Sequence, residues 1–536
     1  MCEGGKQMKL SNRNREETLQ TLKRRRYDLL IIGGGLTGAS IALDATTRGM
    51  DTVLLDMADF GSGGSFRQSM LSFEQGDYYY KTWKDLDKEK ETIATNFSAL
   101  YQKTTGMYVK YRGDLELKNL STIKRSLLFP LRKRQAADSL RALRRKEIQQ
   151  YEPLVNQAQL ERGFLFENGI INRSFMAIEL IKQANQLGTD SVNYLKVTQF
   201  IYDQDEQIIG VEAEDQINGD SVSIYARRVI NATGKNFNRI RRLDVSDQKQ
   251  TLPQTINKKT LIYLNTTTPP IKCVLTFNDI KRKSYVTLIP GKENILMTSI
   301  EKLTRPESLV KRPTETDMDH YLNLLNQVIK DYDFNSDDVT DANLTYEVDY
   351  ESNNDLANVL MVSDAGLVSV LGTETEAYRL YASKIVDQIA KGLKKEVNIL
   401  YSNSETNVIA INRKKQLNVE EFDSIAIDQT DLTQFTKVYG DQTAQVLKYY
   451  QRSEKKSRKH QLDQMLCAEL LYSIEQTAIY TPLDFFIRRT RISYDLDQLR
   501  EQTQGILNLL AHKLAWTKEE RSYFEREFNI WLAEQT

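Results

Sequence analysis

The feature that most constrains the fold is a glycine-rich turn between two apolar runs near the start of the chain. Residues 27–32 (YDLLII) are almost continuously apolar, which is typical of a parallel strand buried on both faces. The turn GGGLTG follows, then a helical stretch, and then a second apolar run, TVLL, at 52–55. This order predicts a βαβ unit, and therefore an α/β fold with a parallel sheet.

The spacing of the glycines matches the GxGxxG pattern of nucleotide-binding turns. Gly33 allows the tight turn, Gly35 lets the backbone approach a pyrophosphate, and Gly38 lets the helix pack closely on the strand. The N-terminus of that helix offers N–H groups to the phosphate anion. Asp56 ends the second strand about twenty residues on, where a carboxylate accepts from ribose hydroxyls and disfavours a 2′-phosphate. The sequence thus predicts a dinucleotide site, and the alternative is an ordinary α/β turn that binds nothing.

The order of the later segments distinguishes FAD from NAD. An NAD dehydrogenase usually continues with regular βα repeats. This chain instead runs through long helical and antiparallel segments before the stretch RVINATG at 228–234. That order favours a flavoprotein, with FAD as its cofactor and a substrate domain that interrupts the nucleotide domain. We expect the backbone of Val197 to contact adenine, and Thr233 with Gly234 to form a late turn that closes over the cofactor.

The composition argues against several other classes of protein. The chain has 73 basic and 73 acidic residues, so no net field favours nucleic acid or an acidic substrate. Its three cysteines and three histidines are scattered, which predicts neither a disulfide framework nor a metal site. No apolar run approaches the ~18 residues of a membrane span, and the N-terminus lacks the apolar core of a signal peptide. We expect a cytoplasmic protein that is at most peripheral on the inner face of the cell membrane.

Local patterns predict the remaining organisation. A short helix is expected over 13–24 with Ser11 or Asn12 as its cap, and a hairpin around 107–117. Further expected elements are a β-meander over 207–234, antiparallel strands within 257–302, a buried run that turns on glycine at 359–372, and helices from about 400 onward. The predicted division is an FAD-binding domain in three parts (1–83, 161–256 and 346–398), a helical insertion of the substrate domain (84–160), an antiparallel substrate domain (257–345) and a helical C-terminal domain (399–536).

Several stretches carry a resemblance to one family. YDLLIIGGGLTGASIALDATTRG followed by DFGSGGSFRQS resembles the opening of the FAD-dependent glycerol-3-phosphate dehydrogenase and α-glycerophosphate oxidase family. The likeness recurs at RVINATG, RPTETDMDHYL, AGLVSVLGTETEAYRLYAS and AELLYSIEQTAIYTPLDFFIRRTR. It implies a glutathione-reductase-like FAD-binding domain interrupted by an antiparallel α+β substrate domain, with an all-α C-terminal domain. It also implies that Ser62, Ser65 and Arg67 of the flavin loop, and Gly372 with Thr373 of a late turn, bind the cofactor.

The reaction of the resembled family is the oxidation of glycerol 3-phosphate to dihydroxyacetone phosphate by hydride transfer to flavin N5. A quinone or oxygen then takes the electrons. The departures from the family pattern fall on groups that this reaction uses. Where the family has lysine, histidine, arginine or a glycine pair, this chain has Met70, Phe73, Glu74, Gln75, Asp77, Leu261, Tyr350 and Glu374, although Lys258 survives.

These departures leave the catalytic residues unassigned. A phosphomonoester is bound by arginine or lysine, and alcohol oxidation uses a base that is most often histidine. His320 and His460 are expected on solvated helix faces rather than at a flavin. Two alternatives to the family reaction therefore stay open. One is a flavin-binding or regulatory module without catalysis, and the other is a flavin oxidase for a less anionic hydroxy acid or amine.

Three further features have two interpretations each. The basic stretch 124–146 fits either an anionic membrane surface or a solvated helix pair. The aromatic residues Tyr78, Tyr79, Tyr80 and Trp83 pack either over the flavin or in the core. Arg488, Arg489 and Arg491 make either interdomain ion pairs, which we favour, or contacts to an anion.

Overall fold

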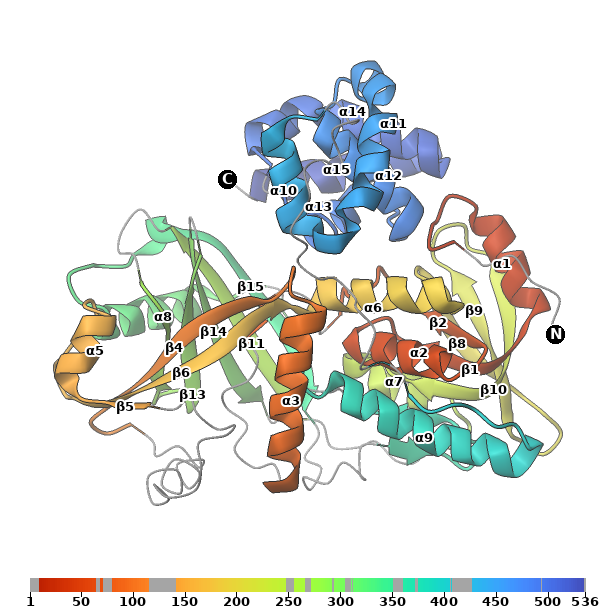
Figure 1. The fold of residues 1–536 in the computed structure, drawn as a ribbon, viewed down its shortest axis with the longest axis horizontal. Helices are drawn as coiled ribbons and strands as arrows, with labels where there is room; N and C mark the ends of the chain where they lie inside the picture. The colour runs from red at the N-terminus through yellow and green to blue at the C-terminus, as the bar shows by residue number, and fades with distance from the viewer. Residues whose placement is uncertain are drawn as a thin grey trace.

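The computed structural model describes fourteen stretches of the chain: residues 9–63, 68–70, 80–114, 141–246, 255–265, 271–291, 294–303, 310, 312–349, 360–371, 375–404, 406, 427–492 and 494–534. They form two β-sheets side by side and a bundle of helices that lies above α6 in the view of Figure 1.

The first sheet is built around the predicted βαβ unit. Its strand order is β16 (Leu360–Val362), β17 (Val368–Val370), β10 (Ser221–Asn231), β1 (Arg26–Ile32), β2 (Thr52–Leu55) and β7 (Asp190–Val192), and all neighbours from β17 to β7 are parallel. Strand β9 (Ile208–Asp215) pairs antiparallel with β10, which confirms the meander predicted over 207–234, and β8 (Leu195–Tyr202) adds a further antiparallel strand beside β9. Because β1 and β2 lie inside this sheet, both have the continuous apolar character seen in the sequence.

Helices cover both faces of the first sheet. On one face, α2 (Leu36–Thr47) packs against α6 (Arg173–Leu187) and α9 (Tyr378–Val397) over an apolar core. On the other face, α1 (Arg15–Arg24) packs with the meander. The carboxyl ends of β1, β2 and β10 therefore meet at one edge, which is where nucleotides bind in such sheets.

The second sheet is mostly antiparallel. Its order is β15 (Val339–Asp349), β11 (Thr255–Asn265), β14 (Asn294–Leu303), β13 (Ser284–Pro290), β12 (Val274–Asp279), β4 (Gln102–Tyr111), β6 (Leu160–Asn172) and β3 (Gln68–Met70), with β5 (Arg141–Leu143) beside β6. Helix α8 (Glu315–Val328) packs on this sheet through an apolar core. Helices α3 (Tyr80–Asn96) and α5 (Arg145–Tyr151) also belong to this part of the chain, whereas the short α7 (Phe237–Arg241) contacts β10 and β17 of the first sheet.

The C-terminal part is helical, as predicted. Its helices are α10 (Gln429–Tyr439), α11 (Thr443–His460), α12 (Gln464–Gln476), α13 (Pro482–Arg488), α14 (Leu496–Leu514) and α15 (Lys518–Glu534), which share one apolar core. The predicted fold, an α/β nucleotide-binding part with an antiparallel sheet and an all-α C-terminal part, is confirmed.

Two local predictions were wrong, and a third is tested only in part. Of the hairpin expected around 107–117, residues 115–117 lie outside the described residues, and 102–111 form the single strand β4, which pairs with β6 and β12. Helix α1 begins after Asn14, and Ser11 and Asn12 instead donate to carbonyls of the C-terminal bundle. The run at 359–372 does turn at Gly366, but Val362 on its first strand is 61% exposed, so only the second strand is buried.

The described helices include none that is both long enough and apolar enough to cross a membrane.

Candidate cofactor site

The glycine-rich turn has the geometry that its spacing predicts. Gly33 follows β1 with a φ of +111°, and a Cβ atom on it would lie 2.6 Å from the carbonyl oxygen of Ala232. A Cβ atom on Gly38 would lie 1.8 Å from the carbonyl oxygen of Gly33. The first turn of α2 therefore rests directly on the Gly33 peptide, and the turns that follow β1 and β10 touch each other.

Gly35 is the N-cap residue of α2 and has no side chain to cap the helix. Serine or aspartate at an N-cap would supply an oxygen to the first N–H groups of the helix. A phosphate oxygen fits this position chemically, since the N-terminus of a helix favours negative charge.

Asp56 lies at the carboxyl end of β2 and faces the glycine-rich turn. Its Oδ2 accepts a hydrogen bond of 2.6 Å from the N–H of Gly34, and its Oδ1 accepts one of 2.9 Å from the N–H of Ala58. Burial raises the pKa of Asp56 to about 6, although these two N–H groups act in the opposite direction. The carboxylate is thus fixed beside the turn, and its oxygens retain lone pairs for hydroxyl donors.

The segment after Asp56 returns to the same turn. Gly61 has a φ of +68°, and its N–H donates to the carbonyl of Gly34 at 3.1 Å. Its own carbonyl accepts a 2.8 Å hydrogen bond from Ser174 Oγ on α6. Ser62 follows, with its N–H directed to the carbonyl of Asp59 at 3.3 Å. We call residues 56–62 the β2 loop.

Thr233 and Gly234 lie in the turn after β10, and Val197 lies near the start of β8. Thr233 Oγ1 donates to Asn231 Oδ1 at 2.6 Å, and Gly234 continues the turn with a φ of +53°. Val197 is buried in β8, a strand whose first residue, Leu195, donates its N–H to the carbonyl of Asp56 at 2.7 Å. The pairing of β8 with β9 shifts register immediately after Val197.

The structure therefore brings a set of the predicted residues to the ends of β1, β2, β8 and β10: Gly33, Gly35, Gly38, Asp56, Ser62, Val197, Thr233 and Gly234. Ser65, Arg67, Gly372 and Thr373 lie outside the described residues. So do Phe73, Asp77, Tyr350 and Glu374, the aromatic residues 78–79 and most of the basic stretch 124–146.

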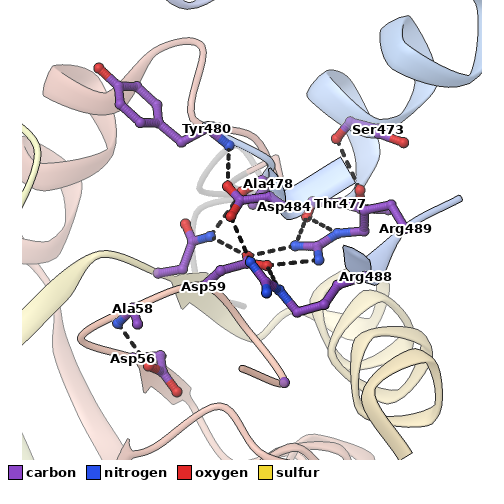
Figure 2. A network of polar contacts seen from close by, with 12 residues as sticks. Asp56, Ala58, Asp59, Ser473, Thr477, Ala478, Tyr480, Asp484, Arg488 and Arg489 are labelled. Carbon is purple, nitrogen blue, oxygen red and sulfur yellow. Dashed lines mark hydrogen bonds and ion pairs between the residues drawn. The ribbon is translucent and has the colours of Figure 1, made fainter. Parts of the chain in front are cut away.

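Sequence reasoning missed the carboxylate at the centre of a polar network that connects the β2 loop to the C-terminal bundle (Figure 2). Asp59, in the middle of the loop, is 1% exposed and binds Arg488 and Arg489. Burial alone would raise the pKa of Asp59, but the guanidinium groups of Arg489 and Arg488 hold it below its ordinary value. The predicted interdomain ion pairs are thus confirmed for these arginines. The sequence analysis named the arginines but not Asp59, whose one available signal was its position three residues after Asp56.

Arg491 behaves differently from its two neighbours. It donates to the carbonyl of Ala99 at 3.0 Å, and its guanidinium lies 5.8 Å from the ring centre of Phe175 and 6.0 Å from that of Tyr439. It thus joins α10 to the segments around α3 and α6, and within the described residues it forms no ion pair with a carboxylate.

The substrate-domain residues singled out from the sequence are held by partners. The expectation of a solvated His320 was wrong, since its Nε2 lies 2.7 Å from Oδ2 of the buried Asp279. Lys258 Nζ lies 3.0 Å from Glu301 Oε2 and 4.0 Å from Asp317 on α8. Leu261 is three residues after Lys258 on β11, so its side chain lies on the opposite face of the sheet. There it packs in an apolar cluster with neighbours such as Ile289.

Two family models match this chain, one over the nucleotide-binding and substrate parts and one over the C-terminal part. A family model described as FAD dependent oxidoreductase matches residues 28–345, and one described as the C-terminal domain of alpha-glycerophosphate oxidase matches residues 380–521. The chain belongs to the FAD-dependent oxidoreductase family, and its cofactor is FAD.

The similar proteins carry more particular names. The chain is 26% identical to the aerobic glycerol-3-phosphate dehydrogenase of Staphylococcus saprophyticus, over 98% of each chain. It is also 26% identical to the protein of that name in Staphylococcus aureus strain USA300, over 97% of each.

Solved structures show the same fold. The glycerol-3-phosphate dehydrogenase from Bacillus halodurans, complexed with FAD, matches with a TM-score of 0.80 at 24% identity, over 98% of each chain. The L-alpha-glycerophosphate oxidase from Mycoplasma pneumoniae, with FAD bound, matches with a TM-score of 0.56 at 14% identity, over 71% of this chain and 97% of that one.

Proposed function

We propose that this protein oxidises glycerol 3-phosphate to dihydroxyacetone phosphate. The observation that carries the proposal is the extent of the likeness to proteins named aerobic glycerol-3-phosphate dehydrogenase, which spans both the nucleotide-binding sheet and the C-terminal bundle. When bound, FAD supplies a hydride acceptor at N5. A quinone or oxygen is the proposed final electron acceptor.

The geometry at the ends of the strands supports part of the proposed set of cofactor contacts. The glycine-rich turn and the uncapped start of α2 are proposed to hold the pyrophosphate, and Asp56 the ribose hydroxyls. The backbone of Val197 is proposed to contact adenine, and Thr233 with Gly234 to close over the cofactor. The flavin contacts are proposed for Ser62, Ser65, Arg67, Gly372 and Thr373.

One observation favours a second candidate function. Lys258 is engaged by acidic partners, and Leu261 on the other face of β11 is in an apolar cluster. Neither offers a free cation or a base to a phosphorylated alcohol. The second candidate is therefore a flavin oxidase for a less anionic hydroxy acid or amine. The third is a flavin-binding module without turnover.

The test is an anaerobic reduction of the purified FAD-loaded protein. Added glycerol 3-phosphate should bleach the visible absorption of the oxidised flavin, and dithionite serves as the control that the flavin can be reduced. Bleaching by a hydroxy acid or an amine, but not by glycerol 3-phosphate, would replace the proposal with the oxidase. Bleaching by dithionite alone would support the module without turnover.

The acceptor is tested on the same sample. Protein reduced by its substrate is mixed with a soluble quinone or with air-saturated buffer, and the return of the flavin absorption is timed. The faster reaction identifies the acceptor. Binding to vesicles that contain anionic lipid tests the proposed peripheral membrane contact.

A further inference from the structure

The β2 loop is fastened to the glycine-rich turn at both of its ends. Asp56 Oδ2 accepts the N–H of Gly34 at 2.6 Å, and the N–H of Gly61 donates to the carbonyl of the same residue at 3.1 Å. Gly34 lies between two glycines of the fingerprint. A displacement of the loop therefore moves the Asp56 carboxylate and the glycine-rich turn together.

The middle of this loop is held from the C-terminal bundle. Arg489 donates to both carboxylate oxygens of Asp59, from Nη2 to Oδ1 at 2.7 Å and from Nη1 to Oδ2 at 3.0 Å. Arg488 Nε donates to Oδ2 at 2.5 Å, and Asn193 Nδ2 donates to Oδ1 at 3.0 Å. Planar bidentate contacts of this kind fix orientation as well as distance.

The arginines are themselves immobilised within the bundle (Figure 2). Arg489 donates to the carbonyl of Thr477 at 2.8 Å, and Arg488 Nη2 donates to Asp484 Oδ1 at 2.8 Å. Asp484 in turn accepts the N–H groups of Tyr480 and Thr481 at the start of α13. The two buried aspartates, Asp59 and Asp484, and the two arginines balance in charge. A shift of α13 would therefore shift the arginines and, with them, Asp59.

We propose that the C-terminal bundle positions the cofactor-binding loop, so that docking of the bundle and binding of FAD stabilise each other through Asp59 and Arg489. Asp59, Arg488 and Arg489 are positioning residues that act through Asp56 and Gly34. The inference rests on the proposed role of Asp56 at the ribose. Such coupling is reciprocal, since whatever the bundle contributes to FAD affinity, FAD contributes to docking of the bundle.

A second contact between the bundle and the nucleotide-binding part supplies a matched control. Lys182 on α6 donates to Tyr472 Oη at 2.9 Å and to Gln442 Oε1 at 2.5 Å, both in the bundle. Lys182 is buried, as Arg489 is, but its hydrogen bonds go to Glu179, Gln442 and Tyr472 and not to the β2 loop. A general loosening of the bundle should follow from losing either contact, whereas an effect through the loop should follow only from losing Asp59 or Arg489.

The first experiment measures FAD affinity and melting temperature of the full-length variants R489Q, D59N, K182M and D56N. We expect R489Q and D59N to weaken FAD binding by about tenfold, within the usual range of coupling between sites. K182M should lower the melting temperature but keep FAD affinity within about twofold of wild type. Wild-type affinity in folded R489Q and D59N would overturn the inference. Unchanged affinity in D56N would instead refute the ribose assignment.

The second experiment uses the unaltered protein, so it does not depend on any variant folding. Amide hydrogen exchange is compared with and without FAD. FAD should slow exchange at Gly34 and Ala58, and also at Tyr480 and Thr481, whose N–H groups bind Asp484. Slowing at the first pair without slowing at the second would show that the bundle is not coupled to the cofactor, and would overturn the inference.

Discussion

Replacing Gly38 with alanine tests the geometry of the cofactor turn most directly. The added Cβ would lie 1.8 Å from the carbonyl oxygen of Gly33, whereas Cβ atoms essentially never come within 3.0 Å of another heavy atom. The partner is backbone, and Gly33 is itself confined by the carbonyl of Ala232 at 2.6 Å from its own Cβ position. The helix and the turn must therefore separate by roughly 1 Å, which is overpacking of the kind that costs about 1–3 kcal/mol.

Two effects of the substitution oppose each other. Alanine is the better helix former by about 1 kcal/mol, so the net loss in the free energy of unfolding of the apoprotein should be about 0–2 kcal/mol. The start of α2 also moves away from the phosphate position. We expect FAD affinity to fall by at least about tenfold, which corresponds to about 1.4 kcal/mol of binding free energy.

Two other glycines in helices provide controls. Gly392 in α9 has nothing within 4 Å of its Cβ position, so G392A should stabilise the protein by about 0.5–1 kcal/mol. Gly505 in α14 would place a Cβ 2.1 Å from the carbonyl of His460, so G505A should destabilise the bundle without a direct effect on the cofactor turn. Urea denaturation and FAD titration of all three variants make the comparison. If G38A is as stable as wild type and binds FAD equally well, the close approach of α2 to Gly33 is refuted.

The other predictions concern buried carboxylates. The pKa of Asp56 in the folded protein is raised to about 6, so folding favours its protonated form. The free energy of unfolding of the wild-type apoprotein, relative to that of D56N, should therefore fall as pH rises from about 4 to about 6 and stay level above pH 6. Urea titrations that show a rise over this window would contradict the prediction. Glu469 is fully buried and accepts hydrogen bonds from Tyr494 Oη at 2.6 Å and Thr490 Oγ1 at 2.8 Å. E469A should therefore lose at least about 2 kcal/mol of the free energy of unfolding, and E469Q less, as measured by thermal melting. Arg15 Nε donates to both oxygens of the buried Asp215, at 2.9 and 2.8 Å. D215A should therefore lose about 3–5 kcal/mol of the free energy of unfolding in urea denaturation. A loss below about 1 kcal/mol would contradict this prediction.

The parts of the fold that could be predicted are those in which local pattern and burial coincide. Strands β1 and β2 are enclosed by neighbours and helices, so each has a continuous apolar run. The glycines at 33 and 38 could be assigned because no other residue fits against the carbonyls that they touch. The bundle could be assigned because helical periodicity is a local property.

The missed features depend on partners that are distant in sequence. Strand β4 has the alternation of a hairpin arm, but its partner β6 begins about 50 residues later, with nothing local to announce it. Ser11 and Asn12 have side chains suited to a helix cap, and the same hydrogen-bonding groups serve a carbonyl of another part of the chain equally well. His320 lies on a helix with a polar face, and only the packed turn at Asp279 reveals its partner.

The pairing of Asp59 with Arg489 also sets an order on biosynthesis. The two residues are 430 positions apart, and at typical rates of synthesis the ribosome needs about 20–90 s to travel between them. During that interval the carboxylate lacks both arginines, and a desolvated aspartate without a cation is strongly disfavoured. The loop that carries Asp56 therefore reaches its final enclosure only after α13 has emerged, so an early-made cofactor element is among the last to be completed.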